Sequence, residues 1–357
     1  MTARRLLVLN PGSTSTKVSV FEDEREVDSS AVAHDTVELS AYPTIAAQHP
    51  MRLSAIRAFL EASDHGDARF DAVVGRGGLL KPVASGVYRV NDAMKHDLRA
   101  GAYGEHASNL GALLAAELAA ESGCSAYIAD PVVVDELDDV ARFSGLPQIE
   151  RRSIFHALNQ KSAAREAATS AGLRYEEAGL IVAHMGGGVS VGAHRNGRVV
   201  DVNNALDGDG PFSPERAGSL PAGQLVSIVL SGDYDERTLR RMLTGGGGLV
   251  AYCGTNSLLE LRERAGSGGS DAAAAIDAMA YQISQEIARH GATLRGRVDL
   301  IVLTGGMAHD DGLVAAIRDR VGFLAPVRVI PGEREMLSLA RAALRVLTGF
   351  EQPKEYV

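Results

Sequence analysis

The sequence has few cysteines, no tryptophan and no long apolar run. Its 357 residues include only two cysteines, Cys124 and Cys253, which lie outside any CxxC spacing. This excludes a disulfide framework and a cysteine-ligated zinc site, and it is typical of a reducing compartment. No apolar run approaches the ~20 residues that span a bilayer, and residues 6–9 are too short for a signal-peptide core. We therefore expect a soluble, cytoplasmic protein with no membrane partner.

An excess of positive charge is also missing. Asp and Glu number 45 against 36 Lys and Arg, which gives a formal net charge of -9. Nucleic-acid binding needs a basic face that displaces counterions, so this balance argues against a nucleic-acid partner. Apolar residues make up 45% of the chain, which excludes disorder as the dominant state, and the length suits two domains of ordinary size.

Glycine, in contrast, is abundant, with 39 residues, and many glycines follow apolar runs. Two apolar runs flank the polar loop 10–17 (NPGSTSTK), a pattern that predicts a β-hairpin. A second pair flanks the loop 184–188 (HMGGG), and a third strand is expected at residues 199–202. The two copies lie half a chain apart, so we expect an internal structural duplication.

Helical periodicity separates and follows these hairpins. Apolar residues on one face predict a helix over residues 110–122, and another over 270–291 with Ser270 as its N-cap. The apolar run 300–303 predicts a buried strand, and a last amphipathic helix is expected over 336–347. This mixture of strands and helices indicates an α/β protein.

Three glycine-containing loops follow predicted strands, at residues 10–17, 186–188 and 304–306. Such a loop can present backbone N–H groups to an anion, although each loop alone could be a polar turn or a flexible segment. Four consecutive hydroxyl residues followed by Lys17 exceed what a turn requires, so we interpret the three loops as a polyphosphate site. The glycine run 245–248 is interpreted as a plain loop. No GxxxxGK(S/T) occurs and no GxGxxG follows a predicted strand, so a nucleotide must be held in another way.

Several segments resemble the motifs of one family. Residues 7–17 resemble the first phosphate motif of the acetate and butyrate kinases, the acetokinase family within the actin-like superfamily. The resemblance covers nearly the whole chain. The form of residues 10–17, 75–78 and 331–336 and the short chain favour the butyrate branch of this family over the acetate branch. Further matches occur, in the family's order, at 75–78 (GRGG), 151–156 (RRSIFH), 183–188 (AHMGGG), 303–307 (LTGGM) and 331–336 (PGEREM).

The resemblance implies the fold. It predicts an α/β protein of two actin-like (ribonuclease H-like) domains with the active site in the cleft between them. The first domain would comprise residues 1–129 together with 336–357, whose helix returns to it. The second, nucleotide-binding domain would comprise residues 130–335. The family also implies a homodimer or a larger homo-oligomer.

The resemblance implies the reaction as well. We expect reversible, direct in-line transfer of a phosphoryl group from ATP to butyrate, which gives butyryl phosphate and ADP, with Mg²⁺ as the cofactor. A carboxylate is ionised near neutral pH, so the reaction needs cations and donors rather than a strong general base. Two alternatives stay open: a kinase for acetate, propionate or a branched-chain acid on the same site, and a nucleotide-dependent switch or ATPase without an acyl substrate.

Individual residues receive roles from the same resemblance. It implies that Arg76 binds the acyl carboxylate, that His156 and Arg216 stabilise the transition state, and that Asn10 and Glu335 lie at the metal. With Asp130 these form the expected catalytic and metal-binding set. The residues expected to bind the nucleotide and its phosphates are Asn10, Ser13, Thr14, Ser15, Lys17, His184, Gly186, Gly187, Gly188, Thr255, Asn256, Gly305 and Gly306.

The chain also departs from the family in places. Acetate kinases carry asparagine where Gly187 stands, a second histidine where Gln160 stands, and aspartate where Thr255 stands. Asp130 matches the catalytic aspartate of the family. Because the carboxylate substrate needs no strong base, we expect Asp130 to position groups or to contact the metal, not to abstract a proton.

Overall fold

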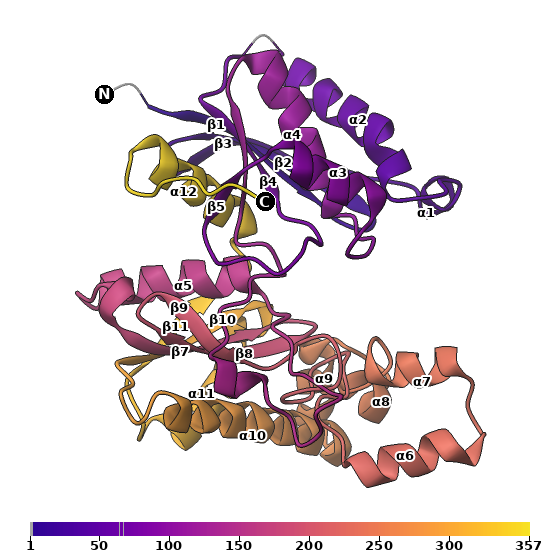
Figure 1. Cartoon of the computed structure of the whole chain (residues 1–357). Helices are drawn as coiled ribbons and strands as arrows, with labels where there is room; N and C mark the ends of the chain where they lie inside the picture. The colour runs from indigo at the N-terminus through magenta and orange to yellow at the C-terminus, as the bar shows by residue number, and fades with distance from the viewer. Residues whose placement is uncertain (1–2, 64, 67) are drawn as a thin grey trace. The chain divides into compact units, whose positions relative to one another are not determined.

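The computed structural model describes residues 3–63, 65, 66 and 68–357 (Figure 1). These residues divide into two compact units, one formed by the chain up to Val134 with Arg334–Val357 and the other by Asp135–Glu333. None of the described helices is long and apolar enough to cross a membrane.

The first unit is built on a six-stranded sheet. Its strands are β1 (Arg5–Pro11), β2 (Ser15–Glu22), β3 (Arg25–Ala33), β4 (Ala72–Arg76), β5 (Val87–Arg89) and β6 (Ser125–Ala129). They pair in the order β3-β2-β1-β4-β6-β5. The strands β1, β4 and β6 are parallel, whereas β2 and β3 extend the sheet as an antiparallel meander. The hairpin around the loop 10–17 is therefore confirmed.

Helices cover both faces of this sheet (Figure 1). Its helices are α1 (Thr36–Ser40), α2 (His49–Ala62), α3 (Asp92–Ala100), α4 (Asn109–Ser122) and α12 (Glu335–Leu347). Strand β1 shows why helices are needed on both faces of the sheet, because its leucines alternate between the two faces and all are buried. Leu7 and Leu9 belong to the core that includes α4, and the alternating residues Leu6 and Val8 point to the face on which α12 packs.

The second unit repeats this plan. Its strands are β7 (Gly179–Met185), β8 (Val189–Arg195), β9 (Arg198–Val202), β10 (Leu300–Gly305) and β11 (Val327–Pro331). They pair in the order β11-β10-β7-β8-β9, with β7, β10 and β11 parallel and β7, β8 and β9 antiparallel. This is the order in which β6, β4, β1, β2 and β3 pair in the first unit. The structural duplication predicted from the two glycine loops is confirmed.

Helices again cover both faces of the second sheet, with α5 on one side and α10 on the other (Figure 1). Leu180 and Val182 pack against the alanine-rich face of α5, whereas Ile181 and Ala183 pack against α10. Helix α10 starts at Ser270 with Gly269 as its N-cap, so the prediction that Ser270 is the cap was wrong by one residue. The helices are α5 (Ala157–Ser170), α6 (Ala222–Ser231), α7 (Glu236–Leu243), α8 (Leu249–Cys253), α9 (Leu258–Gly266), α10 (Ser270–Thr293) and α11 (Asp311–Val321).

Candidate active site

Three polar residues of the first unit lie at the carboxyl ends of adjacent parallel strands. Asn10 lies near the end of β1, Arg76 ends β4 and Asp130 follows β6. Open α/β sheets bind ligands at such ends. Asn10 donates from Nδ2 to Oε2 of Glu335 (2.6 Å), and Nη1 of Arg76 lies 3.0 Å from Oε1 of the same carboxylate. The fold therefore joins Asn10, Arg76 and Glu335, which are far apart in sequence.

The glycines beside Arg76 allow close packing. A Cβ on Gly75 would lie 2.2 Å from the carbonyl oxygen of Gly111 in α4, and a Cβ on Gly77 would lie 2.5 Å from Cβ of Pro131. Helix α4 therefore contacts the backbone of β4 directly, and this contact fixes the position of Arg76 at the end of the strand. Close packing against Pro131 therefore accounts for Gly77.

Asp130 is buried, with 3% of its surface exposed, and it has a left-handed backbone with φ of 37°. This conformation is strained for a residue other than glycine, and such strain often marks functional sites. Its Oδ1 accepts hydrogen bonds from the Ser85 hydroxyl (2.6 Å) and from the Gly86 backbone N–H (2.8 Å). These bonds orient the carboxylate at the strand end, as a positioning role requires.

A buried arginine that the sequence did not single out holds the loop between β1 and β2. Arg52 of α2 is fully buried, and burial lowers the pKa of its guanidinium. Its hydrogen-bond acceptors are the carbonyl oxygens of Gly12, Ser13 and Ser15 and the side-chain oxygens of Thr16 and Gln48. The guanidinium therefore holds the loop by donating hydrogen bonds to the carbonyl oxygens that point toward α2. Ser13 and Thr14 are exposed at its tip, as is Lys17, whose backbone pairs with that of Asn10.

Two histidines meet at the corresponding strand ends of the second unit. His184, near the end of β7, stacks on His156 with ring centroids 4.0 Å apart. Nδ1 of His184 lies 3.0 Å from Oδ1 of Asn159, which can only accept, so this nitrogen donates. Its Nε2 is buried, has no hydrogen-bond partner among the residues that the structure describes, and lies 3.4 Å from Oε1 of Glu333. An orphaned polar atom in this position is available to a ligand.

Arg216 lies directly against the glycine turn between β7 and β8. A Cβ on Gly188 would lie 2.0 Å from Nη1 of Arg216, so only glycine leaves room for the guanidinium. The same nitrogen donates to the carbonyl oxygen of Ala205, and burial lowers the pKa of this arginine. A Cβ on Gly248 would lie 1.7 Å from the carbonyl oxygen of Ser213. The run 245–248 is therefore not a plain loop, because it packs against the segment that carries Arg216.

A cavity of about 600 Å³ opens beside the same turn. Asn256 donates to Oε1 of Glu215 (2.6 Å) at its wall, whereas Thr255 hydrogen-bonds to Glu260 and is not among the lining residues. The chemistry of the wall is mixed, with backbone from the glycine loops, carboxylates, and apolar side chains that suit a flat ring. The lining residues include Gly186, Gly187, Glu215, Asn256, Leu258, Leu259, Gly306, Met307, Asp310 and Glu333.

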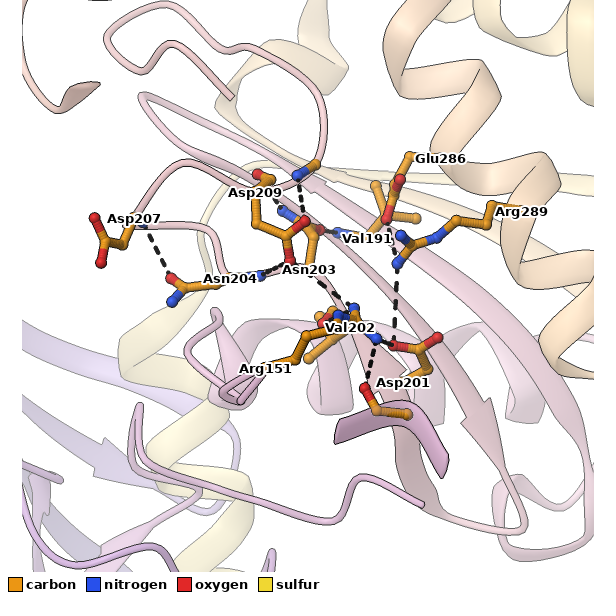
Figure 2. A network of polar contacts seen from close by, with 12 residues as sticks. Arg151, Val191, Asp201, Val202, Asn203, Asn204, Asp207, Asp209, Glu286 and Arg289 are labelled. Atoms are coloured by element: carbon orange, nitrogen blue, oxygen red, sulfur yellow. Dashed lines mark hydrogen bonds and ion pairs between the residues drawn. The ribbon is translucent and has the colours of Figure 1, made fainter. Parts of the chain in front are cut away.

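A network of polar contacts supports the loop that leads to Arg216 (Figure 2). Arg151, from the RRSIFH segment, donates to Oδ1 of Asp201 on β9 (2.8 Å). Its other terminal nitrogen lies 3.9 Å from Asp209, whose Oδ2 accepts from the backbone N–H of Asn204 (3.0 Å). Arg151 therefore ties the strand to the loop that follows it and carries Arg216.

Glu286 of α10 belongs to this network and carries a pH-dependent contribution to stability. It is 8% exposed, lies 2.9 Å from Arg289, and burial raises the pKa of its carboxyl to about 7. The folded state thus binds the proton more tightly than the unfolded chain. This contribution is fully present below the ordinary carboxyl pKa and is lost as pH rises toward 7. Burial lowers the pKa of the neighbouring His290 to about 4, which gives a dependence of opposite sign between pH 4 and 6.5.

Glu286→Gln, which mimics the protonated carboxyl, should isolate the contribution of this one group. We expect the variant to gain stability over the natural protein as pH rises, by about 2 kcal/mol between pH 5 and pH 8. Denaturant unfolding of both proteins at the two pH values measures this difference. Glu236→Gln on the exposed α7 is the control and should show no such trend. A difference that stays constant with pH would contradict the assignment.

Comparison with known proteins agrees with this architecture. The model of the acetokinase family matches residues 148–323. A protein named butyrate kinase 2, from Clostridium acetobutylicum, is 52% identical over 352 residues, which cover 99% of each chain. A probable butyrate kinase from Coprothermobacter proteolyticus is 52% identical over 353 residues, again 99% of both chains.

Solved structures share the fold at low sequence identity. Porphyromonas gingivalis acetate kinase superposes with a TM-score of 0.81 at 18% identity, covering 97% of this chain and 100% of that one. A propionate kinase from Francisella tularensis subsp. tularensis SCHU S4 gives a TM-score of 0.74 at 17% identity, covering 95% and 98%.

The duplicated sheets, together with the superposition on solved kinases, define a two-domain actin-like fold. The class is an ATP-dependent kinase that phosphorylates a carboxylate. The chain belongs to the acetokinase family.

Proposed function

We propose that this kinase phosphorylates butyrate, forming butyryl phosphate and ADP from ATP. The observation that carries the choice of substrate is the 52% identity, over 99% of the chain, to two proteins named as butyrate kinases. A further methylene in an apolar pocket contributes about 1–3 kcal/mol to discrimination, so longer and shorter acids would compete measurably.

In the proposed mechanism, positive and hydrogen-bonding groups gather negative ones. Arg76 binds the carboxylate of the acid, while Arg216 and His156 donate to the oxygens of the phosphoryl group as it moves. The nucleotide occupies the cavity of about 600 Å³, with its phosphates toward the glycine turn at residues 186–188 and Nε2 of His184. Because the acid is already ionised, rate enhancement comes from positioning and charge stabilisation.

Magnesium fits the residues of the first unit. The amide of Asn10 and the carboxylate of Glu335 offer oxygen ligands, and Mg²⁺ is commonly held by one or two carboxylates together with substrate phosphates. Within the described part of the chain, no cluster of three or more His, Cys, Asp or Glu forms an all-protein metal site. When bound, the metal would neutralise charge on the phosphates.

Acyl phosphate formation tests the proposal directly. The protein is incubated with ATP, Mg²⁺ and acetate, propionate, butyrate, isobutyrate or valerate, and the product is trapped with hydroxylamine. The proposal expects the highest kcat/KM for butyrate. A maximum at another acid would overturn the substrate but keep the reaction class, whereas ATP hydrolysis without any acyl product would support the switch or ATPase alternative.

We also infer a homo-oligomer. Helix α6 has no buried residue, and its apolar side chains include Val226 (53% exposed) and Leu230 (79% exposed). Contiguous exposed apolar surface marks interaction sites. The double change Val226→Glu and Leu230→Glu should lower the sedimentation mass toward 37.5 kDa, whereas Phe323→Glu, also at an exposed position, should not. A wild-type mass of one chain would refute the inference.

A further inference from the structure

A continuous chain of hydrogen bonds inside the second unit ends at His156. The Tyr175 hydroxyl lies 2.8 Å from Nδ1 of His194, and Nε2 of His194 lies 3.0 Å from Oε1 of Gln160. Nε2 of Gln160 lies 2.8 Å from the Ser190 hydroxyl, which lies 2.9 Å from Nδ1 of His156. Gln160, Ser190 and His194 are fully buried. Water therefore cannot supply alternative partners. Each donor and acceptor in this hydrogen-bond chain must be paired with a neighbouring protein group.

The orientation of the Gln160 amide determines which group donates and which accepts in each of these hydrogen bonds. Its Nε2 also lies 2.9 Å from the backbone carbonyl oxygen of Ser190, which can only accept, so the NH₂ group faces Ser190 and Oε1 faces His194. His194 must then donate from Nε2. Burial, aided by the nearby cations Lys161 and Arg165, holds the pKa of His194 well below its usual range, so the ring is neutral and Nδ1 accepts from Tyr175.

The donors and acceptors of Ser190 also determine the protonation of His156. The Ser190 hydroxyl accepts one hydrogen of the Gln160 NH₂ group, which leaves its own single hydrogen to be placed. Among the described contacts of that hydroxyl, Nδ1 of His156 is the acceptor within reach. Nδ1 of His156 therefore accepts, and the ring proton resides on Nε2.

We propose that Gln160 is a positioning residue that acts through Ser190 to hold His156 as the neutral tautomer protonated on Nε2. The inference rests on the proposed function, in which His156 donates to the transferring phosphoryl group. It explains why a buried amide stands at residue 160. The amide accepts a hydrogen bond from His194 at its oxygen and donates one to Ser190 from its nitrogen, so every hydrogen bond from His194 to His156 is donated in the same direction. It also explains Gly192, whose Cβ would lie 2.7 Å from Oε1 of Gln160.

The tautomer is measurable without reference to activity. In the full-length protein labelled with ¹⁵N-histidine, His156→Asn identifies the resonances of His156. We expect Nε2 to be protonated and Nδ1 to be bare in the natural protein. Gln160→Glu replaces the NH₂ donor by an acceptor, so the Ser190 hydroxyl should turn toward residue 160 and Nδ1 of His156 should become protonated. Tyr175→Phe breaks only the far end of the chain and should leave the tautomer of His156 unchanged.

Kinetics provide the second readout. We expect Gln160→Glu to lower kcat at least about tenfold with little change in the KM for ATP, because a wrong tautomer removes the donor from the reacting group. Ser190→Ala removes only a hydroxyl, so it tests the same link if a buried glutamate disturbs folding. Gln285→Glu on the exposed face of α10 is the matched control and should have normal kcat.

Three results would overturn the proposal: protonation of Nδ1 in the natural protein, an unchanged tautomer in both Gln160→Glu and Ser190→Ala, or an unchanged kcat in both. Failure of the proposed function is distinct, because it appears as the absence of acyl phosphate from the natural protein. The NMR result would then still decide whether the chain sets the tautomer.

Discussion

Arg216→Ala is expected to lower kcat by about 1,000-fold while the KM values for ATP and butyrate change less than about threefold. The guanidinium is half-buried, donates to the carbonyl oxygen of Ala205 and approaches the glycine turn at Gly188. A preorganised cation in such a place stabilises charge that develops in the transition state more than charge already present in the bound substrates. Steady-state kinetics of acyl phosphate formation measures both constants.

Two comparisons make this prediction specific. Arg216→Lys keeps the charge but loses the planar fork of donors, so it should recover only a small part of kcat. Arg240→Ala removes an exposed arginine that pairs with Glu236 on α7, and it should leave kcat unchanged. If Arg216→Ala retained kcat within about threefold, Arg216 would have no role in the chemical step.

Gly188→Ala is expected to lower kcat by about 100-fold without unfolding the protein. The new Cβ would lie 2.0 Å from Nη1 and 2.5 Å from Cζ of Arg216, the far end of a flexible side chain. The guanidinium must move away, whereas the backbone of the turn can stay. The loss should therefore reach kcat through Arg216, with a smaller effect than deleting the guanidinium outright.

A double-mutant cycle tests this route. If the only effect of Gly188→Ala is to displace Arg216, then the double variant with Arg216→Ala should be no slower than Arg216→Ala alone. Gly145→Ala, at a position where a Cβ would meet nothing within 4 Å, is the control for adding a methyl group and should behave as the natural protein. Additive losses in the double variant would show that Gly188 acts independently of Arg216.

Much of the fold could be predicted from local pattern. Apolar runs around polar glycine loops indicated both hairpins. The run Leu180–Ala183 shows the physical reason, because its side chains alternate between the hydrophobic cores on the two faces of the sheet. The resemblance located candidate residues at strand ends, and the structure brings Asn10, Arg76 and Glu335 together there. Their roles in the reaction stay predictions that the kinetic experiments address.

Other features carried no local signal. Arg52 lies in an ordinary helix, and its importance comes from the carbonyl oxygens of a loop some 40 residues earlier. Glu333 lies in the segment 331–336 that matches the family and Glu215 stands beside Arg216, but neither was singled out from the sequence, and only the structure shows that both line the cavity. Gln160 likewise stands in an alanine-rich helix, and only its buried partners on β8 show what its amide does.

The sequence by itself determined the class of fold, the periodic burial of strands and helices, the loops at strand ends and the family, because these depend on residue types at short spacing. Only the tertiary structure decided which glycines provide space for a neighbour, which cations hold a loop, and which nitrogen of His156 carries the proton. Those features depend on contacts between atoms that are distant in the chain. Close packing sets such contacts, and in a buried site every donor must meet an acceptor.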